Sequence, residues 1–292
     1  MRIMQNEKGK MILAMLLVGT IGIVVSYIPL PSSVIACVRS ILGTLFLAAV
    51  MLVKRSPLSW ERIKPNALFL LLSGAALGFN WIFLFEAYRY TTVAVATLCY
   101  YMAPVFVMLL SPLVLNEQLT PLKKACTCAA VCGAVLISGA LGSGRHDFRG
   151  IGFGLSAAVL YCSIIFLNKK IHGLENLEKT LCQLAVSAVT MSIYVLCTQN
   201  LRTLQFSART IFLLLVIGFV YTGIEYIWFF SAIGSLPAQT SSILSYIDPV
   251  TAILSSALLL HQPLTILQIF GTILILGSMI LNELLSERKK TI

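Results

Sequence analysis

Apolar residues gather in ten blocks along this chain, each close to twenty residues long. A helix of about twenty residues crosses the roughly 30 Å hydrocarbon core of a bilayer. A membrane barrel would instead show alternating segments of about ten residues. We therefore expect an all-α membrane protein with ten transmembrane helices, at 9–28, 32–53, 66–88, 92–115, 120–141, 150–168, 178–198, 209–232, 237–260 and 264–284.

The lysines and arginines between these blocks are unevenly divided. With the N-terminus in the cytoplasm, the inner segments carry fifteen of them. The outer loops carry five: Arg89, Arg145, Arg149, Arg202 and Arg209. Positive charge concentrates on the cytoplasmic side of membrane proteins. The pattern predicts that both termini are cytoplasmic in a multi-pass protein of the cytoplasmic (plasma) membrane. The first block has no small-residue cleavage site, so it is interpreted as a span rather than a signal peptide.

The composition narrows the class of protein further. The chain has 58% hydrophobic and 11% charged residues, which excludes an ordinary soluble domain. Its net charge of +10 is spread over the loops, so we expect no nucleic-acid partner. The loops are too short for a catalytic domain, and no glycine-rich phosphate-binding pattern is complete. We expect no cofactor, and any pumping must draw on ion or substrate gradients.

Three closely spaced cysteines, Cys126, Cys128 and Cys132, raise the alternative of a metal or redox site. No histidine or acid stands nearby in the sequence to complete one. Cysteine also packs well between helices as a small polarizable residue. The packing role is favoured, and no metal site is expected.

The two halves of the sequence resemble each other at an offset of 145 residues. Between 101–120 and 246–265, nine of twenty positions are identical, including Tyr101 with Tyr246 and Pro104 with Pro249. The repeat predicts a first five-helix unit at 1–141, a connecting loop at 142–149 and a second five-helix unit at 150–292.

Five is an odd number of spans, so the second unit must enter the membrane from the side opposite to the first. The result is a 5+5 inverted repeat, an arrangement that secondary transporters use to expose one central site to either side in turn. This alternating access is the strongest functional indication in the sequence.

Several motifs carry a family resemblance. The runs Gly78-Phe79-Asn80-Trp81 and Tyr100-Tyr101-Met102-Ala103-Pro104, with Asn116-Glu117-Gln118-Leu119-Thr120, resemble the EamA domain of the drug/metabolite transporter superfamily. The second copy, around Ser245-Tyr246-Ile247-Asp248-Pro249, is similar to the same domain. The resemblance covers nearly the whole chain. It implies a ten-helix carrier, usually an exporter of small metabolites.

Two carboxylates stand well inside apolar blocks. Glu225 lies in 209–232 and Asp248 in 237–260, and a charge at such a depth marks a functional site by default. A carboxyl group removed from water holds a proton more readily, whereas a cationic substrate favours its ionised form. Competition between proton and substrate is one basis for antiport. The alternative for Asp248 is structural: binding backbone donors before the mid-span proline, or pairing with Arg39.

Polar and aromatic residues accompany these acids at helical spacing. Ser245 shares a polar stripe with Asp248, while Tyr221 and Trp228 share a face with Glu225. Aromatic rings attract cations, so these rings either form a cation-binding cage or simply pack. The full set of candidate binding or coupling residues is Glu225, Asp248, Asn80, Trp81, Tyr101, Tyr221, Trp228, Ser245, Tyr246 and Arg39.

Three further residues are candidates for gating. Pro104 and Pro249 fall mid-span at equivalent positions, where a proline bends a helix. Glu86 lies near the outer end of its span, as either an interfacial or a gating residue. Arg39 has three open roles: extending outward to the interface, pairing with an acid, or binding a substrate carboxylate.

The leading hypothesis is a secondary active transporter that exports a small metabolite, either an amino acid or another small amphipathic or cationic compound, in exchange for protons or another coupling ion. Its other partner is membrane lipid, and it is a monomer or a homodimer. One alternative is an uptake carrier or facilitator for choline-like quaternary amines. Another is a membrane-embedded lipid-modifying enzyme, which is disfavoured because His146, His172 and His261 lie in loops or at span ends. A channel is disfavoured by the repeat.

Overall fold

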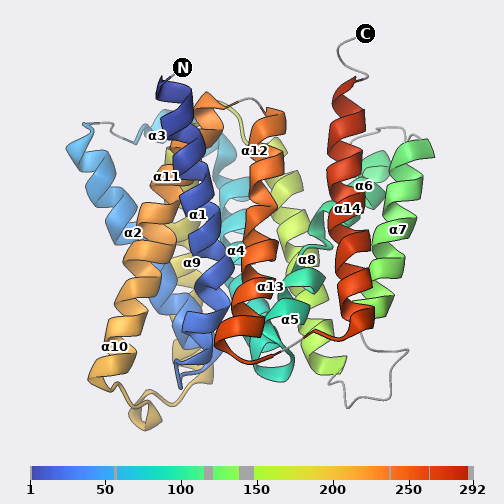
Figure 1. Cartoon of the computed structure of the whole chain (residues 1–292). Coiled ribbons are helices and arrows are strands. Elements are labelled where there is room, and N and C mark those ends of the chain that lie inside the picture. The colour runs from blue at the N-terminus through green and yellow to red at the C-terminus, as the bar shows by residue number, and fades with distance from the viewer. Residues whose placement is uncertain are drawn as a thin grey trace.

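The computed structural model of the chain describes residues 2–55, 58–114, 121–137, 148–236, 238–262 and 264–288 as a bundle of helices, with no strand among them (Figure 1). The connecting loop predicted at 142–149 lies almost wholly outside these residues. The elements are α1 (Arg2–Ser26), α2 (Ser32–Val53), α3 (Trp60–Ile63), η1 (Lys64–Asn66), α4 (Ala67–Tyr90), α5 (Val93–Tyr100), α6 (Ala103–Val114), α7 (Pro121–Ile137), α8 (Phe148–Lys169), α9 (Asn176–Thr198), η2 (Leu201–Thr203), α10 (Ala208–Leu215), η3 (Val216–Ile224), α11 (Glu225–Ser235), α12 (Ala238–Ser245), α13 (Ile247–Leu259) and α14 (Ile266–Arg288).

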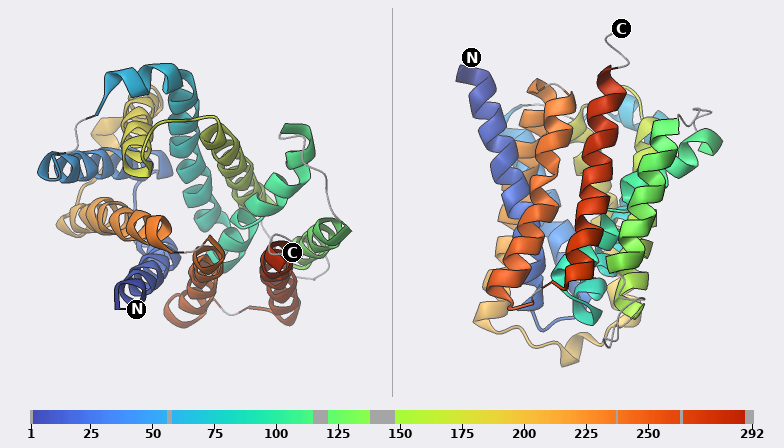
Figure 2. Two further views of the ribbon diagram at one scale, coloured as in Figure 1. Left: turned by 90° about the horizontal axis from the view of Figure 1, so that it is seen from above. Right: turned by 45° about the vertical axis from the view of Figure 1, so that its right-hand side comes forward.

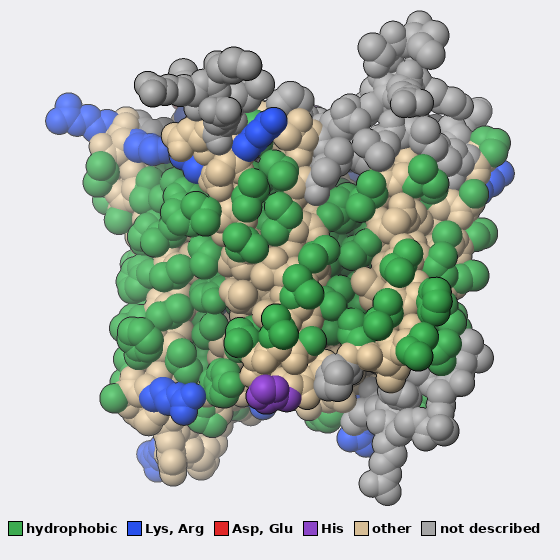
Figure 3. All heavy atoms as spheres, in the orientation of Figure 1, with side chains coloured by type: hydrophobic (Ala, Val, Ile, Leu, Met, Phe, Trp, Pro, Cys, Tyr) green, Lys and Arg blue, Asp and Glu red, His purple; other side chains and the backbone are tan. Residues whose placement is uncertain are grey.

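On the face seen in Figure 3, apolar side chains cover the middle of the bundle, while lysines and arginines lie toward its two ends. Within the described ranges, six helices are long and apolar enough to cross a membrane, and four shorter helices are also apolar. Large apolar side chains such as Leu113, at 80% exposure, point outward as lipid contacts would require. The expectation of an all-helical multi-pass membrane protein is confirmed.

The fourth and ninth predicted spans are each broken into two helices. The first break lies at Tyr101 and Met102, between α5 and α6, and the second at Tyr246, between α12 and α13. Tyr101 and Tyr246 are equivalent in the repeat. Pro104 and Pro249 each fall in the first turn of the helix that follows, where a missing N–H group costs no hydrogen bond. The interruption therefore precedes each proline instead of centring on it.

The eighth predicted span contains a π-helix, η3, between α10 and α11. Within it, the side-chain hydroxyl of Thr222 donates a hydrogen bond to the carbonyl oxygen of Ile217, five residues earlier, at 3.0 Å. π-helical turns are rare and occur mostly at functional sites. This turn ends at Ile224, so Glu225 is the first residue of α11.

Helices from the two halves of the chain alternate in the bundle. The most extensive contacts join α4 to α8, α7 to α14, α2 to α9 and α1 to α13. Gly74 and Gly78 allow α4 to approach α9: a Cβ atom at Gly74 would lie 2.7 Å from the Gln183 carbonyl oxygen. Viewed from above, the helices surround a common axis, with α7 and α14 together at one edge (Figure 2).

The helix directions alternate along the chain. α1 begins at one end of the bundle and α14 finishes at that same end, so the two ends of the chain lie on one side (Figure 1). α8 begins at the opposite end from α1.

Candidate functional site

Arg39 is the buried cation of the bundle interior. It projects from α2 and is 6% exposed. Its guanidinium carbon lies 4.0 Å from the centre of the Trp81 ring, on α4. Its Nε donates to the Thr222 hydroxyl at 2.9 Å, and Nη2 donates to the Tyr221 carbonyl at 3.3 Å. A ring face and the π-helix together hold the guanidinium in place.

Glycines allow α2 to approach the π-helix closely. A Cβ atom at Gly218 would lie 2.3 Å from the Cβ of Leu42, and one at Gly223 would lie 2.5 Å from the Phe46 ring. On the facing helix, a Cβ at Gly43 would lie 2.6 Å from Thr222. Small residues at such an interface let helix backbones approach. The short separation brings Arg39 within reach of the π-helix backbone.

Glu225 is buried, at 3% exposure, and interacts electrostatically with Arg39 and Asp248. Its Oε2 atom is shielded from solvent and has no hydrogen-bond partner among the described residues. Asn80, its counterpart in the first repeat, donates from Nδ2 to the Ala157 carbonyl at 2.6 Å, and its Oδ1 atom is also unpartnered within the described part of the chain. Both positions therefore keep an acceptor that is free to bind a ligand.

Asp248 has a partner from the other repeat. The Tyr101 hydroxyl donates to its Oδ2 at 2.6 Å, so the break in one span is joined to the start of α13. Gly19 makes room for this part of α13, because a Cβ there would lie 2.6 Å from the Asp248 carbonyl oxygen. The alternative that Asp248 pairs with Arg39 is not what the structure contains, because neither residue takes part in the ion pairs found between described residues, such as Arg62–Glu178.

Five tyrosines interact with these charges, and only Tyr101 among them is a predicted site residue. The rings of Tyr100 and Tyr161 are 5.4 Å apart, which joins α5 to α8. Tyr100 lies inside a family motif, which could have drawn attention to it. Tyr161 has no such signal. Each of the five interacts electrostatically with at least one of Arg39, Glu225 and Asp248: Tyr88, Tyr100, Tyr101, Tyr161 and Tyr226.

Three of the other predicted site residues lie at the edge of this group or apart from it. Tyr221 contributes its carbonyl to Arg39, and its hydroxyl lies 2.9 Å from that of Thr20 on α1. The Ser245 hydroxyl donates to the Ser241 carbonyl within α12. Trp228 packs against an apolar cluster of α1 and α11 that includes Met11 and Met15.

The two remaining predicted residues are Tyr246 and Glu86. Tyr246 packs against the cluster of α5, α6 and α14. The side chain of Glu86 is 25% exposed and lies 4.0 Å from Arg89 on the same helix.

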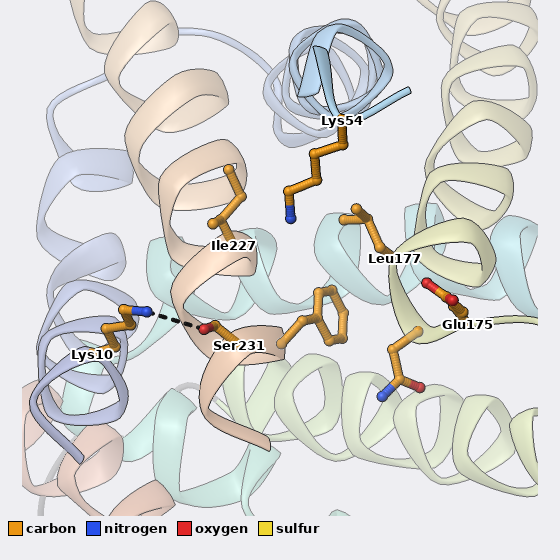
Figure 4. Close-up of a pocket in the computed structure, with 8 residues that line it drawn as sticks. Lys10, Lys54, Glu175, Leu177, Ile227 and Ser231 are labelled. Carbon is orange, nitrogen blue, oxygen red and sulfur yellow. Dashed lines mark hydrogen bonds between the residues drawn. The ribbon is translucent and has the colours of Figure 1, made fainter. Parts of the chain in front are cut away.

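A cavity of about 500 Å³ opens near the end of the bundle that carries both termini. Figure 4 shows the Lys54 side chain reaching into it, between Ile227 and Leu177. At its edge Lys10 contacts the Ser231 hydroxyl at 3.1 Å and Glu7 at 2.7 Å. Ser231 in turn donates to the second Glu7 oxygen at 2.8 Å, which ties α1 to α11.

No group of three histidine, cysteine or carboxylate side chains in the described ranges has the geometry to hold a metal ion. Cys126 is buried, whereas Cys128 and Cys132 are exposed on the outer face of α7. The chemistry available in the interior is therefore that of carboxylates, a guanidinium, an amide and phenols. This set binds charged organic groups and protons.

The sequence profile of the EamA-like transporter family matches the chain twice, at residues 10–139 and 148–284. The chain belongs to the EamA-like transporter family. The two matches support a duplicated architecture, and a family of transporters agrees with the expectation that the chain is not an enzyme. The residue boundaries of the two units remain a prediction.

Relatives of known sequence are themselves named only as transporters. The uncharacterized transporter YxxF of Bacillus subtilis (strain 168) is 28% identical, covering 97% of this chain and 91% of the relative. An uncharacterized transporter of Archaeoglobus fulgidus is 25% identical, with coverages of 81% and 83%. One solved crystal structure has a TM-score of 0.62 at 18% identity, over 97% of this chain and 98% of that one. This last likeness concerns the fold alone.

Proposed function

We propose that this family member is a proton-coupled secondary transporter of the cytoplasmic membrane that exports a small amphipathic or cationic metabolite by alternating access. The observation that carries the proposal is the pair of buried carboxylates, Glu225 and Asp248, among tyrosines in the bundle interior. An ionisable group at membrane depth is expensive and is retained where it binds an ion or substrate. We assign the proton as the coupling ion because a carboxyl group removed from water binds a proton more readily.

The arrangement of the two halves supports alternating access through an inverted repeat. Helices α1 and α8 start at opposite ends of the bundle, and equivalent spans are interrupted at Tyr101 and Tyr246. Pro104 and Pro249 follow these breaks and prevent a continuous helix from forming there. We propose that Pro104, Pro249 and Glu86 serve as gating or hinge residues. Both termini are placed in the cytoplasm, and the working unit is a monomer or a homodimer.

The two carboxylates differ in a way that fits exchange. Asp248 already accepts a hydrogen bond from Tyr101, whereas Glu225 has an unpartnered oxygen. Glu225 is therefore the group on which a proton and a cationic substrate exclude each other, because a proton removes the charge that binds the cation. A second candidate cargo is a choline-like quaternary amine taken up by facilitated diffusion, which the tyrosine rings favour.

The test is flux into proteoliposomes under an imposed pH gradient, with a mixed pool of amino acids and choline as cargo. We expect wild type to move one class of compound only when the gradient is present, and Glu225→Gln to lose that dependence. Glu61→Gln is the matched control, because Glu61 is exposed on the short helix α3. Gradient-independent flux that Glu225→Gln leaves unchanged would contradict proton coupling and favour a facilitator.

A further inference from the structure

The backbone at Glu225 departs from an α-helix. In an α-helix its N–H group would donate to the carbonyl four residues back, which is that of Tyr221. It donates instead to the carbonyls of Val220 and Thr222, five and three residues back. The carbonyl between them, that of Tyr221, accepts a hydrogen bond from Nη2 of Arg39 at 3.3 Å. A side chain of α2 thus binds the acceptor that the Glu225 backbone would use in an α-helix.

The Thr222 side chain follows the π-helix as well. A threonine hydroxyl within an α-helix donates to the carbonyl three or four residues back, as Thr44 of α2 does to Ser40 at 2.7 Å. Thr222 donates to the carbonyl of Ile217, five residues back, and its oxygen accepts from Nε of Arg39 at 2.9 Å. One arginine therefore binds two consecutive residues of the π-helix through two different nitrogens.

The interface between α4 and α9 is related to this one by the repeat, and it lacks both residues. At the offset of 145 residues, Leu184 of α9 stands in place of Arg39, and Leu77 of α4 stands in place of Thr222. A leucine side chain neither donates nor accepts a hydrogen bond. The span that carries Leu77 is one unbroken α-helix, α4. The chain thus contains its own comparison, in which the π-helix accompanies the arginine and the threonine.

We infer that Arg39 and Thr222 are positioning residues for the coupling carboxylate, because their hydrogen bonds hold the π-helix and so set the direction of Glu225. The inference rests on the proposed function, which assigns proton exchange to Glu225 but gives the buried arginine no role. A π-helical segment accommodates an additional residue, and each residue of an α-helix turns it by about 100°. If η3 wound as an α-helix, α11 would therefore rotate by roughly 100° relative to α10.

Such a rotation would change the surroundings of Glu225 and the contacts of the whole of α11. Among the described residues, the charged and titratable groups that interact with Glu225 come from four elements, α2, α13, α8 and α11: Arg39, Asp248, Tyr161 and Tyr226. Further along α11, the Ser231 hydroxyl donates to the carboxylate of Glu7, on α1, at 2.8 Å. The contact between α1 and α11 therefore reports the direction of α11 independently of transport.

The first test measures that direction by cross-linking. Glu7→Cys and Ser231→Cys are combined in a full-length variant that lacks the native cysteines and are treated with a short bifunctional thiosulfonate reagent. We expect efficient cross-linking with Thr222 intact or replaced by serine, since both keep the hydroxyl. Thr222→Val keeps the shape but not the hydroxyl and should lower the yield severalfold. Arg39→Leu, which copies the residue of the α4–α9 interface, should do the same.

Thr44→Val is the matched control for the loss of a threonine hydroxyl. Thr44 lies on α2, and its hydroxyl donates to Ser40 within that helix. This variant should leave the cross-linking yield at the level of the parent.

The second test is the pH profile of flux in proteoliposomes, with the same pool of amino acids and choline as cargo. We expect Thr222→Val to move the pH of half-maximal flux by about half a unit or more, a roughly threefold change in the proton affinity of Glu225. Thr222→Ser should restore the profile, and Thr44→Val should not change it. A merely structural role of Thr222 would lower flux by the same factor at every pH.

Unchanged cross-linking in Thr222→Val and Arg39→Leu would overturn the inference, as would lower cross-linking with an unchanged pH profile. In either case, loss of gradient dependence in Glu225→Gln would leave the proposed function standing. Flux of the wild type that ignores the gradient would instead remove the proposed function. The cross-linking yields alone would then decide whether Arg39 and Thr222 hold the direction of α11.

Discussion

The hydrogen bond from Tyr101 to Asp248 joins the two repeats at the level of single atoms, and its two partners can be changed separately. Tyr101→Phe leaves Asp248 buried without its donor, which should destabilise the fold by about 1.5–3 kcal/mol. Asp248→Asn keeps an oxygen that accepts the same hydrogen bond but cannot carry a charge. We expect Tyr101→Phe to lower the thermal unfolding temperature in detergent, and Asp248→Asn to leave it close to wild type.

Flux through the same two variants gives the complementary readout. Asp248→Asn should lose gradient-driven flux if this carboxylate takes part in coupling, although the protein stays folded. Tyr101→Phe should keep the carboxylate and therefore some coupling. If Asp248→Asn unfolds as readily as Tyr101→Phe, the role of Asp248 is to hold the fold through its charge and not to exchange a proton.

Sequence reasoning at this scale indicated the charged residues and three of their contacts, Trp81, Tyr101 and Tyr221, but it did not indicate Thr222, Tyr100 or Tyr161. Glu225 and Asp248 stand out because a carboxylate within an apolar run is rare. Tyr161 does not stand out, because a neutral aromatic in such a run fits packing, anchoring and ligand binding equally well. Trp228 shows the limit of helical spacing: its distance along the chain from Glu225 suggested a common site, but it packs against the apolar cluster that includes Met11 and Met15.

Among the helical elements, the π-helix η3 depends on close contact with α2, and glycine provides that contact. Gly218→Ala would place a Cβ atom 2.3 Å from the Cβ of Leu42, so α2 and η3 must separate. We expect lower thermal stability in detergent and weaker retention of Arg39 on Thr222, which reduces flux. Gly152→Ala on α8 is the matched control, since nothing lies within 4 Å of its Cβ position, and it should leave both quantities near wild type.

The contrast between the spans shows which elements a sequence can predict. The equivalent mid-span prolines Pro104 and Pro249 predicted bends in their helices, and the structure contains breaks within one turn of each. The π-helix was not predicted, because Val216–Ile224 is as apolar as an ordinary span and its residues carry no signal for i→i+5 bonding. Local composition indicates where a helix ends, but it does not indicate whether its turns are α-helical or π-helical.

For the whole molecule, the proposed orientation predicts which end of α9 reaches the outside. Cys197 is exposed near the end of α9, opposite the end of the bundle that holds the termini. In intact cells carrying a variant whose only cysteine is Cys197, a membrane-impermeant maleimide should label the protein. A variant that keeps Cys126 alone should stay unlabelled, because that side chain is buried. Labelling of Cys197 only after the membrane is opened would reverse the orientation.

The ten apolar blocks sufficed to predict a multi-pass helical membrane protein, because the cost of unpaired backbone groups in lipid leaves so few alternatives. They did not indicate which helices are neighbours. The main contacts run between halves, as in α4 with α8 and α1 with α13, and such pairings depend on side-chain fit at positions such as Gly19 that look ordinary in the sequence.

This interleaving has a consequence for biosynthesis. When the ribosome has finished the first five spans, the partners of α1, α2 and α4 have not yet been made, and at about 5–20 residues per second they are completed roughly 1–24 s later. During that interval Arg39 has neither Thr222 nor Tyr221 to bind, and Asn80 lacks the Ala157 carbonyl. The nascent half-protein must shelter these polar groups at the insertion machinery or with a membrane chaperone until the second half is threaded between its helices.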